Sequence, residues 1–184
     1  MQQATFPDAA IDRTVILLTT LVGGAVSSLV KSGTEAPMPP RVPGEVSPPA
    51  AHLDAWLGRA GVDWHALDYW YQSVKVPGAV MLYHWGFSFV FAYAYVALAA
   101  RWPAVRKWYG AAYGLAITAV MHGLLIPALG FRHPAYAPGT TGWLWNLNGY
   151  ELWSELVGHV CWSMSIEICL IAVLAQRWGT ARAG

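Results

Sequence analysis

The sequence predicts an all-α membrane protein: a bundle of four transmembrane helices with a long outer loop carrying short amphipathic helices. Three observations predict this class. Of the 184 residues, 56% are hydrophobic and only 11% are charged, a composition typical of multi-span membrane proteins. The chain has 11 tryptophans, and Trp is enriched at membrane–water interfaces. Four apolar segments approach or exceed the ~20 residues that cross a bilayer, so we expect one integral-membrane domain over residues 1–184.

The first apolar segment predicts a transmembrane helix over about residues 14–31. A secretory signal peptide is the alternative interpretation. The preceding residues hold Asp8 and Asp12 against a single Arg13, so they lack the positively charged start of such a peptide. We therefore expect the helix to be retained. Lys31 closes it, and this side chain is expected to snorkel toward the lipid headgroups.

Residues 32–77 are predicted to form the long outer loop. Its first part is rich in proline and is expected to be extended and irregular. Glu35 and Arg41 flank three prolines there, and this run either folds back toward Lys31 or Glu155 or remains a solvated loop. The second part predicts two short amphipathic helices, lying on the membrane surface or capping the bundle. Their apolar residues are Leu53, Trp56 and Leu57, then Trp64, Leu67 and Tyr71.

Three further transmembrane helices are predicted over about residues 78–100, 109–130 and 150–176. Pro127 is expected to kink the second of these near residue 123, because a proline ring clashes with the carbonyl four residues earlier. Small residues predict close helix packing at two places: Gly23 and Gly24, and the spacing Gly110-x-x-x-Gly114.

The distribution of lysine and arginine predicts the orientation. These residues are denser in the short segments on one side than in the long loop on the other, so both termini are expected to be cytoplasmic. No basic cluster exceeds the pair Arg106–Lys107, and the formal net charge is +1, so nucleic-acid binding is not expected. Membrane lipids are the expected partners, and a homo-oligomer is left open. Cys161 and Cys169 are interpreted as small buried residues, because helical spacing holds them too far apart for a disulfide.

The last predicted helix carries ionisable residues where a lipid-facing helix would have none. Glu155 and His159 lie one turn apart, so their side chains are expected to meet and to titrate as a unit. A carboxylate at the membrane centre costs roughly 2.5–3.5 kcal/mol on insertion scales, which favours its burial against a partner. Glu167 lies deeper, and it either pairs across an oligomer interface or is protonated in lipid.

Three histidines share one predicted depth in the membrane. His84, His122 and His159 each lie roughly 9–13 Å below the outer ends of their helices, at 1.5 Å rise per residue. The sequence does not show that they face one another. Convergence would make a metal or haem site, because imidazole suits zinc, copper and haem iron. Otherwise each can donate to a neighbouring carbonyl and only lock the packing. No cofactor is expected, with a metal or haem at these histidines as the alternative.

Two stretches resemble the YagU family of bacterial inner-membrane proteins. They are GAVSSLVKSGTEAPMPPRVP, at the end of the first helix, and SELVGHVCWSMSIEI, in the last helix. The resemblance implies a four-span protein of the bacterial inner membrane that is associated with survival of acid stress. The positions that match the family's motifs include the candidate functional residues: Lys31, Glu35, Arg41, His84, His122, Glu155, His159 and Glu167.

These observations together favour a proton-responsive membrane protein, in the manner of a channel or transport component. Histidine titrates near pH 6.5 when unperturbed, which suits a sensor of external acid. A metal or haem site is one alternative, and a structural or accessory membrane subunit is another. An enzyme is not expected, because the sequence has no nucleophile motif and no phosphate-binding glycine loop.

Overall fold

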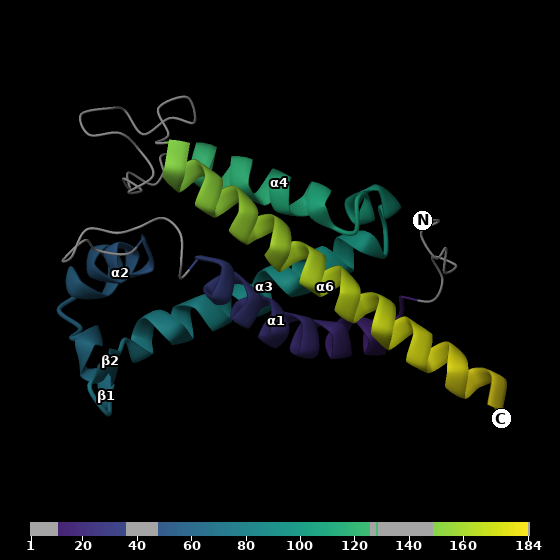
Figure 1. The fold of residues 1–184 in the computed structure, drawn as a ribbon, viewed down its shortest axis with the longest axis horizontal. Coiled ribbons are helices and arrows are strands. Elements are labelled where there is room, and N and C mark those ends of the chain that lie inside the picture. Colours follow the sequence, from purple (N-terminus) through teal and green to yellow (C-terminus); the bar gives the residue numbers. More distant parts are fainter. Residues whose placement is uncertain (1–10, 36–47, 126–127, 129–148, 184) are drawn as a thin grey trace.

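The protein is an all-α bundle with one short β-hairpin. The computed structural model describes residues 11–35, 48–125, 128 and 149–183. Its principal helices are α1 (Arg13–Glu35), α3 (Gly78–Ala99), α4 (Ala111–Val120) and α6 (Gly149–Ala183), shown in Figure 1. Among the described residues, three stretches are long and apolar enough to cross a membrane: Arg13–Thr34, Gly78–Ala99 and Leu152–Gly179. The stretch Ala111–Leu125 is a shorter apolar helix.

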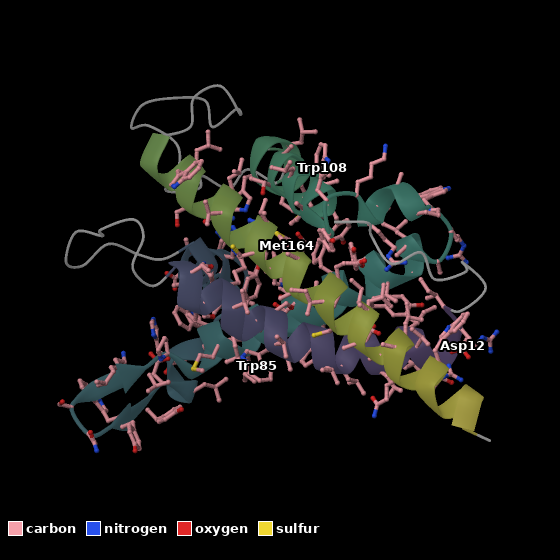
Figure 2. The ribbon with its side chains drawn as sticks, turned by 45° about the vertical axis from the view of Figure 1, so that its right-hand side comes forward. Asp12, Trp85, Trp108 and Met164 are labelled. Carbon is pink, nitrogen blue, oxygen red and sulfur yellow. The ribbon has the colours of Figure 1, made fainter. Side chains whose placement is uncertain are left out.

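Successive helices alternate in direction, so α1 and α6 run antiparallel (Figure 1). At one end, Arg177 Nη1 of α6 lies 2.6 Å from both carboxylate oxygens of Asp12, beside the start of α1 (Figure 2). This guanidinium holds the pKa of Asp12 below its ordinary value. At the other end, Lys31 Nζ lies 3.5 Å from Glu155 Oε2. We call these the Arg177 end and the Lys31 end of the bundle.

Glycines allow α1 to pack closely against two neighbours. A methyl group on Gly23 would lie 3.4 Å from Ile166 of α6, and one on Gly24 would collide with the ring of Phe89 of α3. The pair therefore lets α1 lie between these helices, with its most extensive contacts to α6. The predicted role of the small residues in α1 is confirmed.

The spacing Gly110-x-x-x-Gly114 brings α4 against α6. Gly110 has φ of +86°, which a side chain rarely adopts, and a methyl group there would lie 2.9 Å from the Ser163 carbonyl. A methyl group on Gly114 would lie 2.5 Å from both the His159 carbonyl and Ser163 Oγ. The backbone of α4 thus touches α6 directly, as the motif predicts.

Trp162 stands at the centre of the hydrophobic core and is fully buried. Its Nε1 donates to Ser88 Oγ at 3.2 Å, and its ring stacks on Tyr113 with centroids 6.1 Å apart. Besides Tyr113 of α4, the surrounding buried residues come from α1, α3 and α6: Val15, Ala92, Tyr95, Val96, Ala99, Ile166, Leu170 and Leu174. This apolar core packs the four helices together. It separates Glu155 and His159 from Glu167 along α6.

The helix that contains His122 differs from its predicted bounds. It begins at Ala111 rather than residue 109, because Trp108, Tyr109 and Gly110 all have positive φ and form a tight connection from α3. After Val120 the chain continues as the π-helical turn η5 (Met121–Leu125). The expected distortion near residue 123 falls in this turn, and Pro127 lies outside the described residues.

α3 (Gly78–Ala99) matches its predicted bounds to within one residue, whereas the first and last predicted helices are longer than expected. α1 continues past residue 31 to Glu35, and α6 begins at Gly149 and continues past residue 176 to Ala183. Lys31 therefore lies inside a helix instead of closing it. Its ammonium lies against Glu155 of α6.

Within residues 48–77, the described part of the loop after α1, one of the two predicted amphipathic helices is present. α2 (Pro48–Leu53) continues into the π-helical turn η2 (Asp54–Gly58), and Leu53 packs with Trp64 on the start of α3. This part caps the bundle. The second predicted helix is wrong: it is a single turn, η3 (Trp64–Leu67), followed by the hairpin strands β1 (Tyr69–Tyr71) and β2 (Val74–Val76).

Aromatic and β-branched residues explain the hairpin, because both types favour strands over helix. Asp68 anchors its base, with Oδ2 3.0 Å from Lys75 Nζ and 3.0 Å from His65 Nδ1. The hydrogen bond to His65, followed by that to Lys75, lowers the pKa of Asp68. The carboxylate therefore stabilises the hairpin down to pH values below its ordinary pKa.

The close contact between α4 and α6 predicts the effect of adding one methyl group. Gly114→Ala should lower the free energy of unfolding in detergent by about 1–3 kcal/mol, because the methyl group overlaps the His159 carbonyl. Gly86→Ala in α3 is the matched control, since no atom lies within 4 Å of its added methyl group. The control should be neutral or stabilising, because alanine favours helix over glycine. Equal effects of the two changes would contradict this packing.

Candidate functional site

Four buried ionisable side chains meet at the Lys31 end of the bundle. Lys31 comes from α1, His122 from η5, and Glu155 and His159 from α6. They are exposed by only 7%, 8%, 7% and 1%, respectively. We call this group the Glu155 cluster. Its members come from three elements distant in sequence, so the fold is what assembles it.

One carboxylate oxygen is the centre of the cluster. Glu155 Oε2 lies 3.5 Å from Lys31 Nζ and 3.4 Å from His122 Nε2. It also lies 3.6 Å from Nδ1 of His159, one helical turn further along α6. A single carboxylate oxygen therefore lies near three side-chain nitrogens. The predicted contact between the side chains of Glu155 and His159 is confirmed. In the structure, Lys31 and His122 also contact Glu155.

A second contact fixes the proton arrangement of His159. Its Nδ1 lies 2.7 Å from the backbone carbonyl oxygen of Glu155, and a carbonyl only accepts, so Nδ1 carries the hydrogen. In the neutral ring Nε2 then holds the lone pair. The rings of His122 and His159 meet edge to face, with centroids 5.0 Å apart. The two imidazoles are thus in direct contact, next to one carboxylate.

Of the three histidines predicted to share one depth, His122 and His159 belong to the cluster and His84 lies near it. His122 and His159 are in contact, as the convergent interpretation requires. His84 of α3 lies near enough for the charges of Lys31 and Glu155 to act on it, and it is half-buried. Snorkelling of Lys31 is wrong, because its ammonium is buried against Glu155.

Two other candidates fall where the structure gives no side chain. Glu35 ends α1, but its side chain lies outside the described residues, as do Arg41 and the whole run 36–47. The predicted folding back of the proline-rich segment therefore stays a prediction.

Glu167 forms a second buried ionic centre, which lies inside the bundle and faces neither lipid nor an oligomer interface. It is fully buried inside the chain, with Arg106 Nη2 2.7 Å and Arg106 Nε 2.9 Å from its Oε1. Tyr95 donates to its other oxygen at 2.7 Å. Glu167 therefore meets a cation of its own chain, and it gives no support to a homo-oligomer. The sequence signal for this site was the spacing of four along α6 that links Glu155, His159, Ser163 and Glu167.

The Glu155 cluster has the donor set of a metal site. One donor atom each from His122, Glu155 and His159 lies within 4.8 Å of the others, and all three residues are buried. The ammonium of Lys31 already stands 3.5 Å from the carboxylate, where it would repel a divalent cation. In this arrangement a haem plane has no place between two imidazoles in edge-to-face contact.

The net charge of the cluster follows from its protonation state. With Lys31 and Glu155 ionised and both imidazoles neutral, it has no net charge. Adding one proton, either to Glu155 or to an imidazole, leaves a net positive charge inside the bundle. A buried unpaired charge is costly.

The fold and the buried centre define a multi-pass helical membrane protein with an ionisable core. Residues 25–168 match the family model described as "Protein of unknown function (DUF1440)", and the chain belongs to this family. It is also 31% identical to inner membrane protein YagU of Escherichia coli (strain K12), over 172 residues that cover 80% of this chain and 78% of that protein. The resemblance to the YagU family is thereby confirmed, as is the inner-membrane class. No solved structure matches the chain.

The role of Lys31 as counter-ion predicts a large effect of removing its charge. Lys31→Met should lower the free energy of unfolding in detergent at neutral pH by about 3–5 kcal/mol, because Glu155 is left buried without its cation. Adding Glu155→Gln should restore part of the loss, since no charge then needs a partner. Lys75→Met, which breaks the ion pair to Asp68 at the hairpin, is the control and should cost no more than about 1 kcal/mol. A Lys31→Met protein as stable as the wild type would contradict the assignment.

Proposed function

We propose that this protein is a proton-responsive component of the inner membrane, of the channel or transport kind, and that the Glu155 cluster is its sensor. One observation carries the proposal: a single buried carboxylate oxygen lies within 3.6 Å of three side-chain nitrogens, those of Lys31, His122 and His159. This assignment is compatible with the acid-stress role that the family resemblance implies. We propose no enzymatic activity for this protein.

Protonation changes the contacts that hold three elements together. Glu155 joins Lys31 of α1 and His122 of η5 to α6. A neutral Glu155 no longer attracts the ammonium, and two cationic imidazoles would repel both it and each other. The groups that act on this carboxylate from the packed elements are Lys31 of α1, His84 of α3, His122 of η5 and His159 of α6. Acid therefore favours separation of the elements at the Lys31 end, or entry of water there.

The two rival functions make different demands on the cluster. A resident metal ion would have to displace the ammonium of Lys31, so metal analysis of the purified protein should find no stoichiometric metal. A structural or accessory subunit needs only that the cluster hold helices together. Such a protein would lose stability on substitution but would show no pH-dependent change of conformation.

We further propose four membrane crossings, with α4 and η5 in the third. The contact between Asp12 and Arg177 places the start of α1 and the end of α6 at one end of the bundle, and an even number of crossings agrees with this. The short loops at that end carry the denser positive charge, so both termini are assigned to the cytoplasm. Membrane lipids are the partners that this arrangement requires.

Glu155→Gln tests the sensor, because it removes the charge and keeps the size. The wild type should show a change in the distance between spin labels at Ser32→Cys and Leu124→Cys between about pH 4 and 7, the interval that holds the reference values of Glu and His. The Gln variant should fold but lose this change. Double electron–electron resonance in nanodiscs measures it, in a background with Cys161→Ala and Cys169→Ala.

The matched control for this experiment is Asp68→Asn, which removes a carboxylate from the hairpin and should leave the response intact. A full response in the Glu155→Gln protein would show that Glu155 is not the sensor, and His84 would become the better candidate.

The orientation is tested by labelling cysteines with a membrane-impermeant maleimide in intact spheroplasts. Gln72→Cys at the hairpin turn should react, because the outer loop lies outside the cytoplasm. Arg101→Cys, an exposed residue after α3, should react only after the membrane is broken. The reverse pattern would overturn the assigned orientation.

A further inference from the structure

The facing sides of α4–η5 and α6 carry two rows of buried residues, each with a spacing of four. Residues four apart lie on one side of a helix, so each row follows one face. The row on α6 is Glu155, His159, Ser163 and Glu167. The facing row begins at Gly110, the residue just before α4, and continues with Gly114 and Thr118 of α4 and His122 of η5. All eight residues are buried.

The two rows lie against each other along their length. At the Lys31 end the rings of His122 and His159 touch, with centroids 5.0 Å apart. In the middle, Gly114 lies against Ser163 Oγ, and beyond it the methyl position of Gly110 is 3.2 Å from Glu167 Cβ. We call this contact zone the seam. It joins the Glu155 cluster to the Glu167 centre over about 18 Å of helix, at 1.5 Å rise per residue.

The type of polar side chain changes along the seam. Titratable groups stand at both ends, and the hydroxyl groups of Ser163 and Thr118 lie between them. Each hydroxyl donates to a carbonyl of its own helix: Ser163 to Val160 at 3.0 Å, and Thr118 to Gly114 at 2.9 Å. A hydroxyl both donates and accepts, so its rotation can join the two ends by hydrogen bonds. In the structure described here both hydroxyls point to the backbone, and the chain of hydrogen bonds is broken.

We infer that the seam is a gated proton path between the two ends of the bundle, described here in its closed state. An imidazolium of the Glu155 cluster gives its proton to a hydroxyl oxygen, and that hydroxyl releases its own hydrogen to the next acceptor. The last acceptor is the carboxylate of Glu167, which passes the proton on at the Arg177 end. No bond other than O–H and N–H changes, no electron is transferred, and the driving force is the proton gradient. The inference rests on the proposed function only for the entry of the proton at the Glu155 cluster.

The charged and titratable groups at both ends fit this assignment. The entrance holds Lys31, His84, His122, Glu155 and His159, and the exit holds Tyr95, Arg106, Tyr113 and Glu167. The cation at each end, Lys31 and Arg106, prevents a metal cation from following the same path, because like charges repel at short range. Protons are the ions that a line of hydroxyl and imidazole groups can carry without an open pore.

Proton uptake into liposomes tests the path. The full-length protein is reconstituted with a pH-sensitive dye inside, and a potassium diffusion potential with valinomycin drives protons inward from about pH 5, below the reference value of His. The seam variant combines Thr118→Val with Ser163→Ala and removes both hydroxyls. The control variant combines Thr19→Val with Ser27→Ala, two fully buried hydroxyls of α1 that lie outside the seam.

The wild type and the control variant should carry protons faster than empty liposomes, and the seam variant should be slower by about tenfold or more. The seam variant should keep the pH-dependent spin-label distance, because the Glu155 cluster is intact. Wild-type flux equal to that of empty liposomes, or a seam variant that conducts like the wild type, overturns the path. If the double variant does not fold, Ser163→Ala alone decides between the same two outcomes. Loss of the path would leave the sensor proposal standing, since that proposal fails only if Glu155→Gln keeps its pH response.

Discussion

The burial of two carboxylates on one helix constrains the whole bundle. α6 carries Glu155 and Glu167 into a setting with little water, where each needs a cation at hydrogen-bond or ion-pair distance. Lys31 serves the first from α1, and Arg106 serves the second from the connection between α3 and α4. Each pairing fixes the rotation of one element about its axis and its height along α6. The apolar core around Trp162 then fills the space that these two ion pairs define.

Such pairs contribute more to specificity than to stability. Replacing a buried ion pair with apolar residues of similar volume is often neutral or stabilising, whereas removing one partner is strongly destabilising. The two pairs in this protein therefore act against alternative packings, because a rotated α1 or a shifted α3–α4 connection would leave a carboxylate without its cation. Gly24, Gly110 and Gly114 also favour the observed packing, because each allows a close helix contact that a side chain would block.

The sequence was sufficient for the class, the four apolar segments and the contact between Glu155 and His159, because these depend on composition and helical spacing alone. The sequence was not sufficient to predict the ion pair between Lys31 and Glu155. Whether Lys31 reaches the headgroups or Glu155 depends on the rotation of α1 about its axis, which the sequence does not specify. Arg106 could not be placed because it reaches α6 from a connection whose direction is set by positive φ at Trp108, Tyr109 and Gly110. The hairpin was mistaken for a helix because Trp64, Leu67 and Tyr71 fit helical spacing over too few residues to exclude strands.

The π-helical turn η5 gives His122 a property that the other members of its cluster lack. A π turn contains one residue more than the α-helix it interrupts, and such turns recur at functional sites. Returning η5 to α geometry would rotate its residues by about 100°, the angle that one residue occupies at 3.6 residues per turn. His122 would then swing away from Glu155 while α1 and α6 stayed where they are. His122 therefore stands on an irregular turn, whereas Lys31, Glu155 and His159 stand on regular α-helix.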